Sequence, residues 1–195
     1  MQNLGTGTIV VLFGPSGSGK TTLLEALWRG NPELFCRLVT CTSRAKRHGE
    51  IDGYDYHFRD THFFENNQGL ILNNVSEEGH HYALDQAHLQ VPQPYTLITL
   101  RRKGVLTLLR SHYNVAAVCL EISDSLREER MRARGDAETD IQSRMNVKGN
   151  GVEAECLYDL EDQIPLCSVD SSLALETNQA AVVEFLATLR MSPTL

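Results

Sequence analysis

Cysteines are few in this chain, and none of them forms a CxxC pair. The 195 residues include five cysteines, an odd number, namely Cys36, Cys41, Cys119, Cys156 and Cys167. Scattered cysteines without a pairing pattern are typical of reduced thiols in a protein of the cytoplasm. We therefore expect reduced thiols and not a disulfide framework.

Positive charge and long apolar runs are also scarce. Lysine and arginine total 18 against 25 acidic residues, so the net charge is −7 and the pI is near 5.5. Proteins that bind a nucleic-acid backbone are usually basic, which argues against that role. Apolar runs such as residues 9–13 fall far short of the roughly 20 residues that span a bilayer, and residues 1–8 lack the lysine or arginine of a signal peptide. These features predict a cytoplasmic protein without a nucleic-acid or membrane partner.

What the chain does contain is an ordinary globular composition, 42% hydrophobic and 22% charged, in which strand and helix patterns alternate. Strands are predicted over residues 8–13, 38–42, 95–100, 115–122 and 164–169. Helices are predicted over residues 21–29, 104–110, 124–134 (capped by Asp124), from 141 onward after a break at 135–140, and over 177–189. This alternation predicts a three-layer α/β fold around a parallel sheet.

Residues 52–84 interrupt the alternation because they contain no long helical pattern. Asp60 and Thr61 are placed to cap a short helix holding Phe63 and Phe64. Residues 69–75 and 80–84 flank a turn at 77–79, which is the pattern of a β-hairpin. We interpret this segment as a lobe inserted into a single domain of residues 1–195.

The most informative motif directly follows the first predicted strand. Residues 14–21, GPSGSGKT, fit the pattern GxxxxGK[ST], and a helical pattern follows. Glycines let the backbone curl its N–H groups around an anion, and the helix N-terminus favours negative charge. Lys20 is expected to reach the β- and γ-phosphates of ATP, and the Thr21 hydroxyl to bind Mg²⁺. The residues expected to bind ATP are Gly14, Ser16, Gly17, Ser18, Gly19, Lys20, Thr21 and Thr22. The alternative is a tight strand-to-helix turn with this composition by chance.

A second stretch, residues 40–58, reads TCTSRAKRHGEIDGYDYHF. It resembles the guanylate kinase family, in which the corresponding stretch is roughly S-x-T-T-R-x-x-R-x-G-E-x-x-G-x-D-Y-x-F and the loop before it is typically GPSGSGK. Residues 79–82, GHHY, are similar to the G-x-x-Y turn of that family, and residues 130–135, RMRARG, with 141–144, IQSR, are similar to its lid. The resemblance covers residues 8–169. It implies a P-loop NTPase fold with a small inserted acceptor-binding lobe, approximately residues 36–90, and a helical lid at 124–150.

The resemblance also implies a site for an acceptor that carries a phosphate. Arginines form bidentate bonds to phosphate oxygens, and tyrosine hydroxyls donate to them. The residues assigned to the acceptor are Thr40, Arg44, Arg47, Tyr56, Asn73 and Tyr82. The residues assigned to stabilising the transferring group are Lys20 and, on the lid, Arg130, Arg134 and Arg144. The alternatives are a solvated basic loop over residues 44–47 and an exposed helix whose arginines pair with Glu128 and Glu129.

The chain departs from the family where the acceptor is recognised. Asn73 stands where the family usually has a glutamate that accepts hydrogen bonds from guanine, and Leu84 stands where it has a serine. Thr99 and Arg101 replace two aspartates, of which the first usually supports Mg²⁺ and the second faces the acceptor. Arg101 would suit an acceptor with a second anionic group, or it would turn to solvent at the end of the strand.

The expected function is transfer of the γ-phosphoryl group of ATP, with Mg²⁺, to a small phosphate-bearing acceptor by a monomer or homodimer. The family's default acceptor is GMP. One alternative is a kinase for another phosphomonoester, such as a ribose bisphosphate. A second alternative is a binding module that has lost catalysis. Such modules usually have a degraded phosphate-binding loop, so the intact Lys20 and Thr21 favour an enzyme.

Overall fold

The structure is a computed structural model that describes residues 7–46, 49–67, 69–75, 79–85, 88, 92–100, 105, 108, 113–146 and 163–191. The strands are β1 (Thr8–Phe13), β2 (Phe35–Arg37), β3 (Cys41–Thr42), β4 (His57–Phe58), β5 (Leu70–Val75), β6 (His81–Asp85), β7 (Tyr95–Thr99), β8 (Val115–Glu121) and β9 (Leu166–Asp170). The helices are α1 (Lys20–Gly30), α2 (Thr61–Asn66), α4 (Asp124–Ala133), α5 (Glu138–Asn146) and α7 (Leu175–Met191).

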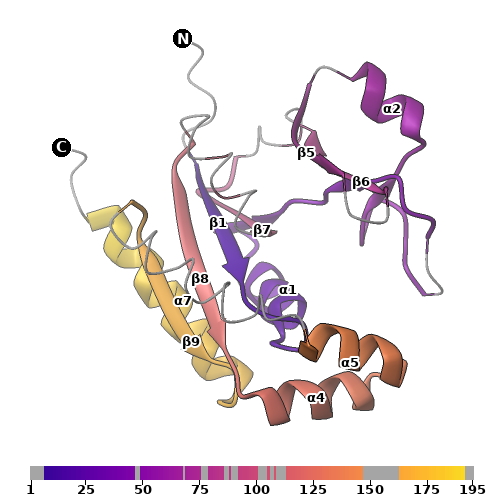
Figure 1. The fold of residues 1–195 in the computed structure, drawn as a ribbon. Coiled ribbons are helices and arrows are strands. Elements are labelled where there is room, and N and C mark those ends of the chain that lie inside the picture. The colour runs from indigo at the N-terminus through magenta and orange to yellow at the C-terminus, as the bar shows by residue number, and fades with distance from the viewer. Residues whose placement is uncertain are drawn as a thin grey trace.

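A central sheet of five parallel strands is formed by the described residues, in the order β2-β7-β1-β8-β9. Strands β2 and β7 lie on one side of β1, and β8 and β9 lie on the other (Figure 1). The chain segment that follows β1 therefore emerges where the strand order reverses, which is where α/β folds bind their ligands. Helices α4 and α5 lie at the end of the sheet toward which β1 points (Figure 1).

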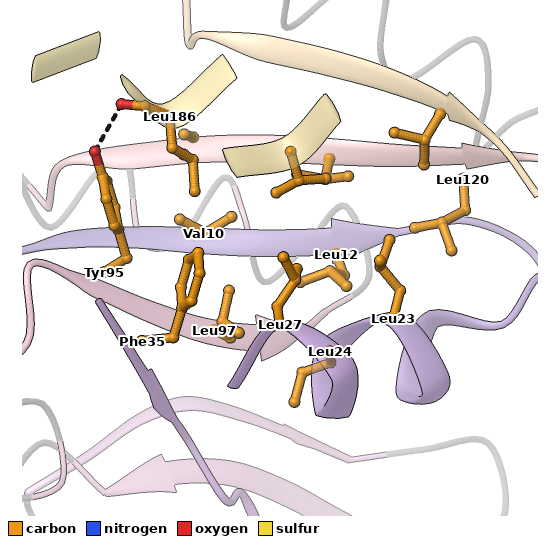
Figure 2. Close-up of a cluster of buried hydrophobic side chains, with 14 residues drawn as sticks. Val10, Leu12, Leu23, Leu24, Leu27, Phe35, Tyr95, Leu97, Leu120 and Leu186 are labelled. Atoms are coloured by element: carbon orange, nitrogen blue, oxygen red, sulfur yellow. Dashed lines mark hydrogen bonds between the residues drawn. The ribbon is translucent and has the colours of Figure 1, made fainter. Parts of the chain in front are cut away.

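Helices α1 and α7 cover one face of this sheet. Leu23 and Leu27 of α1 and Leu186 of α7 belong to a cluster of buried side chains that includes Val10 of β1 (Figure 2). The leucines recur at helical spacing, so one face of α1 is buried against the sheet. The Tyr95 hydroxyl donates a hydrogen bond of 2.7 Å to the carbonyl oxygen of Leu186 and so links β7 to α7 (Figure 2).

The opposite face of the sheet carries a second buried cluster. Ile9 and Val11 alternate with Val10 along β1, so their side chains point to this face. They pack with Val105 and Leu108, which are helical and each 1% exposed. Because both faces are covered, β1 reads in the sequence as an unbroken apolar run. The predicted three-layer α/β fold around a parallel sheet is confirmed.

A smaller sheet lies within residues 41–85, in the order β4-β3-β6-β5, and pairs β5 with β6 antiparallel as the predicted hairpin. Helix α2 covers one face, where Phe64 packs with Cys41 and Ala83. Tyr82 and Leu84 point to the other face because side chains alternate along a strand. Leu84 is fully buried in the same cluster as Ile9 and Val11, so it packs the smaller sheet against the central one.

The strand predicted over residues 38–42 is correct only at Cys41–Thr42. Phe35–Arg37 pairs with β7 in the central sheet, whereas Cys41–Thr42 pairs with β4 and β6 in the smaller sheet. Residues 38–40 connect the two sheets. Leu38 is only 6% exposed because it packs in the cluster between them, so its apolar character reflects that packing and not a strand.

The cap of α4 and the start of α5 also differ from the prediction. The side chain that caps α4 is Ser123, which accepts from the backbone N–H of Leu126, and Asp124 is the first helical residue. Helix α5 begins at Glu138 and not at residue 141, so the predicted break at 135–140 is shorter. The predicted cap of α2 is confirmed, because Asp60 accepts from the backbone N–H of Phe63 at 2.9 Å.

The remaining predictions concern helices and thiols. Of the helix predicted over residues 104–110, only Val105 and Leu108 are described. In the described part of the chain Cys36, Cys41, Cys119 and Cys167 are reduced, as predicted, and Cys156 lies outside it. Among the helices that the structure describes, none is both long and apolar enough to cross a membrane.

Candidate active site

The loop after β1 is closely packed against the end of β8, which is a neighbour of β1 in the sheet, and against helix α4, which follows β8. Gly14, Gly17 and Gly19 have φ angles of +146°, +85° and +84°, which other residues adopt only with strain. A Cβ atom on Gly14 would lie 2.8 Å from the carbonyl oxygen of Leu120 at the end of β8. A Cβ atom on Gly17 would lie 2.9 Å from the carbonyl oxygen of Arg127 in α4. Gly14 and Gly17 are therefore required both by the curl of the loop and by its packing, and Gly19 by the curl.

Positive charge is concentrated inside this loop. Helix α1 begins at Lys20, with Gly19 as its N-cap, and neither a capping side chain nor an acidic residue in the first turn neutralises its N-terminal N–H groups. The Lys20 ammonium donates to the carbonyl oxygens of Gly14 and Pro15 at 2.5 and 2.8 Å, so it lies within the loop. This arrangement suits the phosphates of a nucleotide.

Ser18 provides a further polar group in the loop. The residue is 1% exposed, and within the described part of the chain its hydroxyl has no hydrogen-bond partner. Its carbonyl oxygen accepts from the Ser171 hydroxyl at 2.9 Å, which ties the loop to the turn after β9. Thr21 and Thr22 are exposed on the first turn of α1. The structure thus gathers all the residues predicted to bind ATP in one loop and helix start.

Arg127 connects the loop to both helices that follow β8, and the sequence analysis missed it. The residue is 2% exposed, and its Nε donates to the carbonyl oxygen of Ser16 at 3.1 Å. One Nη donates to Asp124 at 2.7 Å, and the other donates to the carbonyl oxygen of Arg144 in α5 at 3.4 Å. The only signal in the sequence is the spacing of Asp124 and Arg127, and that spacing is common on exposed helices.

Arg130 lies beside the loop, as a lid arginine should. One of its Nη atoms donates to the carbonyl oxygen of Ser171 at 2.6 Å, and the other is 3.8 Å from the position that a Cβ on Gly19 would occupy.

Arg134 and Arg144 meet at the connection between α4 and α5, where both bind the carboxylate of Asp136. Arg144 is 2.6 Å from that carboxylate, and Arg134 contacts it with two nitrogens. These guanidinium groups lower the pKa of Asp136. The structure thus places Arg130 at the loop and joins Arg134 to Arg144 through a carboxylate that the sequence analysis did not single out.

Three of the predicted acceptor residues come together on the smaller sheet. The Arg44 guanidinium is 5.5 Å from the ring centroid of Tyr56, and the rings of Tyr56 and Tyr82 are 6.2 Å apart. Arg44 is 8% exposed and forms a two-pronged ion pair with Glu50 at 2.6 and 3.0 Å. The hydrogen bonding with Glu50 raises the pKa of Arg44, so the guanidinium stays charged. Glu50 is therefore the partner that holds this cation in place.

The other predicted acceptor positions are less fully described. Thr40 is half-buried, and its carbonyl oxygen accepts from the backbone N–H of His57 at 2.9 Å, next to Tyr56. Asn73 lies in β5, where the pairing with β6 shifts register between Ile71 and Asn74. Arg47 and Arg101 lie outside the described residues.

Leu84 does not fit the position of a base-contacting side chain. It was compared with a guanine-binding serine in the sequence, yet its side chain is fully buried in the core between the two sheets. The change from serine to leucine therefore contributes to packing, and Leu84 carries no information about the acceptor.

The strand order and the loop define a P-loop NTPase fold, and comparison with known proteins identifies the family. The family model described as "Guanylate kinase" matches residues 6–160. A guanylate kinase of Trichormus variabilis (strain ATCC 29413 / PCC 7937) is 30% identical over 188 residues, which are 93% of this chain and 92% of that protein. A guanylate kinase of Carboxydothermus hydrogenoformans is 33% identical over 151 residues, 72% of each chain. The chain belongs to the guanylate kinase family.

Two solved structures have folds similar to that of this chain. A guanylate kinase from Anaplasma phagocytophilum has a TM-score of 0.65 and 22% identity, covering 97% of this chain and 90% of that one. A gluconokinase from Sinorhizobium meliloti 1021 has a TM-score of 0.53 and 20% identity, and the match covers 94% of this chain and 93% of that one. At these identities the similarity shows the fold alone.

The family uses ATP together with Mg²⁺, and the loop of this chain fits both. The cationic Lys20, the uncapped start of α1 and the buried Ser18 hydroxyl together provide positive charge and hydrogen-bond donors for phosphate oxygens. Thr21 would provide the hydroxyl ligand for Mg²⁺. When bound, the metal ion would neutralise charge on the phosphates.

Replacing Arg127 by methionine tests whether this arginine holds the loop. Methionine fills much of the same space but cannot donate to Ser16 or to the Arg144 carbonyl. We expect the free energy of unfolding to fall by about 1–3 kcal/mol and ATP to bind several-fold more weakly. Urea unfolding and calorimetric titration with ATP measure the two effects.

Arg132→Met is the matched control on the same helix. The Arg132 side chain is half exposed and pairs only with the surface carboxylates of Glu128 and Glu138 among the described residues. Its loss should change the free energy of unfolding by less than about 1 kcal/mol and leave ATP binding unaltered. Equal ATP affinities in the two variants would show that Arg127 does not shape the loop.

Proposed function

We propose that this protein transfers the γ-phosphoryl group of ATP to the phosphate of a nucleoside monophosphate. The observation that carries the proposal is the presence of two separate groups of side chains whose chemistry suits phosphate oxygens. Lys20 and the start of α1 form one group, and Arg44 with Tyr56 and Tyr82 forms the other. A hydrolase needs only the first group, whereas a kinase acting on a phosphorylated acceptor needs both.

The chemistry requires positioning and charge neutralisation more than covalent participation. Phosphoryl transfer proceeds in line between two oxygens, and charge on the transferring group must be stabilised. We assign this role to Lys20 and Arg130, which lie at the loop, and to Arg134 and Arg144 of the lid segment 124–150. The acceptor phosphate is already an anion, so no general base is needed to activate it.

Arg44 is prepared for this task by its neighbours. The two-pronged ion pair with Glu50 and the contact with the Tyr56 ring hold the guanidinium in one orientation. A cation ordered in advance loses less side-chain entropy when it binds a phosphate. Arg47 is proposed as the second arginine of the acceptor site, in the lobe assigned to residues 36–90.

GMP is the acceptor that the family favours, and we propose that this chain accepts it with weak selectivity. The relatives compared above are guanylate kinases. A carboxylate can accept from both donors on the edge of guanine, whereas Asn73 offers one acceptor and one donor. Location in the cytoplasm, and action as a monomer or homodimer, stay predictions from the sequence.

A coupled assay of ADP release tests the proposed function. Wild-type protein with ATP and Mg²⁺ should turn over with nucleoside monophosphates, and a panel that includes sugar phosphates identifies the best acceptor. Lys20→Ala should lower the turnover about 100-fold or more with the fold intact, because a cation at the transferring group is lost. Arg132→Met, which removes a surface cation, should retain full turnover. A Lys20→Ala variant within a few-fold of wild type would contradict the assignment.

Asn73→Glu tests the proposal about the acceptor. The introduced carboxylate should pair with both donors of guanine and raise the preference for GMP over AMP, in kcat/KM, by about tenfold or more. Asn74→Glu is the matched control, because it adds the same charge one residue further along β5. A wild-type enzyme that already prefers GMP strongly, and is not improved by Asn73→Glu, would show that other residues recognise the base.

A further inference from the structure

Tyr54 connects the turn between β3 and β4 to helix α1. Its hydroxyl accepts a hydrogen bond of 2.7 Å from Arg29 and donates one of 2.9 Å to Glu25, and both of these residues belong to α1. Its carbonyl oxygen accepts from Arg37, at the end of β2, at 2.7 Å. Three segments that are distant in the sequence therefore meet at one tyrosine.

The ring of Tyr54 adds contacts to these hydrogen bonds. The Arg37 guanidinium lies 4.4 Å from the ring centroid, and the ring of Trp28 lies at 6.5 Å. The Arg37 side chain is 10% exposed, and its other Nη is 3.7 Å from the Glu25 carboxylate, too far for a hydrogen bond. If Tyr54 moved away from α1 and β2, the buried Arg37 guanidinium would lose its hydrogen bond to the Tyr54 carbonyl. This cost favours the position of Tyr54 seen in the structure.

The turn that carries Tyr54 is itself stiff. The backbone N–H groups of Tyr54 and Asp55 donate to the carbonyl oxygen of Ile51 at 3.1 and 2.9 Å. The Asp55 carboxylate in return accepts from the N–H of Ile51 at 2.7 Å, and Gly53 donates to the carbonyl oxygen of Tyr56 at 2.8 Å. A displacement of Tyr54 is therefore transmitted to both ends of the turn.

The two ends of this turn hold the proposed acceptor cation. Glu50 precedes the turn and binds Arg44, and Tyr56 ends the turn with its ring beside the same guanidinium. The partner of Tyr54, Glu25, lies on the same helix as Lys20, little more than one turn away. The Tyr54 contact thus links the group that would hold the acceptor phosphate to the helix that would hold ATP.

We propose that Tyr54 is a positioning residue that sets the distance between the two phosphate sites. This role rests on the proposed function, and it goes beyond that function in naming the contact that aligns the two substrates. Neither Arg44 nor Lys20 loses a direct partner when the Tyr54 hydroxyl is removed. The expected defect is therefore in kcat and not in the binding of either substrate. Misplacement of reacting groups by about 1 Å can reduce a rate 100-fold.

Tyr54→Phe tests the proposal because it removes only the hydroxyl. We expect kcat to fall about tenfold or more, with the dissociation constants of ATP and of the acceptor within about twofold of wild type. Tyr95→Phe is the matched control, because it removes a tyrosine hydroxyl that binds a main-chain carbonyl in the core (Figure 2). It should lower the midpoint of urea unfolding and leave kcat unchanged.

Substitutions of Glu25 test the same hydrogen bond from the side of its acceptor. Glu25→Gln retains an oxygen that accepts from the Tyr54 hydroxyl, so it should keep most of kcat. Glu25→Ala removes one of the two hydrogen bonds of the Tyr54 hydroxyl, so kcat should fall, by no more than in Tyr54→Phe. Combining Glu25→Ala with Tyr54→Phe should cost little more than Tyr54→Phe alone, because Tyr54→Phe already removes the bond to Glu25.

Trp28 gives a readout that does not depend on activity. It is the only tryptophan in the sequence, and the Tyr54 ring lies near it. Without substrates, Tyr54→Phe should increase the quenching of Trp28 fluorescence by acrylamide, since the ring remains but the turn is less firmly docked. Tyr95→Phe should not change it.

The outcomes separate this proposal from the proposed function. Wild-type protein without turnover on any acceptor would overturn the proposed function. Wild-type turnover with an unchanged kcat in Tyr54→Phe would overturn only the positioning role, whether or not quenching increases. An effect confined to the KM of the acceptor would also overturn it.

Discussion

The close packing of the phosphate-binding loop against β8 and α4 is the constraint on which the rest of the structure depends. Gly14 and Gly17 leave no space for a side chain against the carbonyls of Leu120 and Arg127. Because of this contact, the loop and the helices that follow β8 form one unit, which Arg127 ties together from within. An arginine on α4 is consequently brought to the loop without having to reach across solvent. This packing is possible because the loop follows β1, the middle strand of the sheet. The neighbouring strand β8 leads directly into α4.

The smaller sheet and its loops are attached to the rest of the fold by two kinds of contact, one apolar and one hydrogen-bonded. Leu84 and Leu38 bury apolar surface against the central sheet and contribute mainly stability. Tyr54 instead makes directional hydrogen bonds to α1, which restrict orientation as well as distance. Phosphoryl transfer between two bound substrates depends on the alignment of their phosphates, so the directional contact is the one expected to influence the rate.

The sequence was sufficient for the features that local patterns determine. Buried parallel strands read as continuous apolar runs, and the glycine-rich loop has a composition that little else requires, so β1 and the loop were predicted correctly. The strand predicted over residues 38–42 was placed too early because Leu38 is buried by contact between two sheets, which no local pattern records. Arg127 and Asp136 were missed, and Glu50 was quoted in the stretch 40–58 without a role, since each owes its role to a partner brought close by the fold. Their charges alone resemble those of any solvated surface.

The most direct measurement of the two-site arrangement is a pair of calorimetric titrations of Arg44→Ala, one with ATP and one with GMP. Arg44 contacts only residues of the smaller sheet and its loops among those that the structure describes. Loss of its charge-assisted bonds should weaken GMP by roughly 10- to 100-fold, which corresponds to about 1.5–3 kcal/mol, and leave the dissociation constant of ATP within about twofold of wild type. An equal loss of affinity for both nucleotides, in a variant that remains folded by circular dichroism, would contradict the division into two sites.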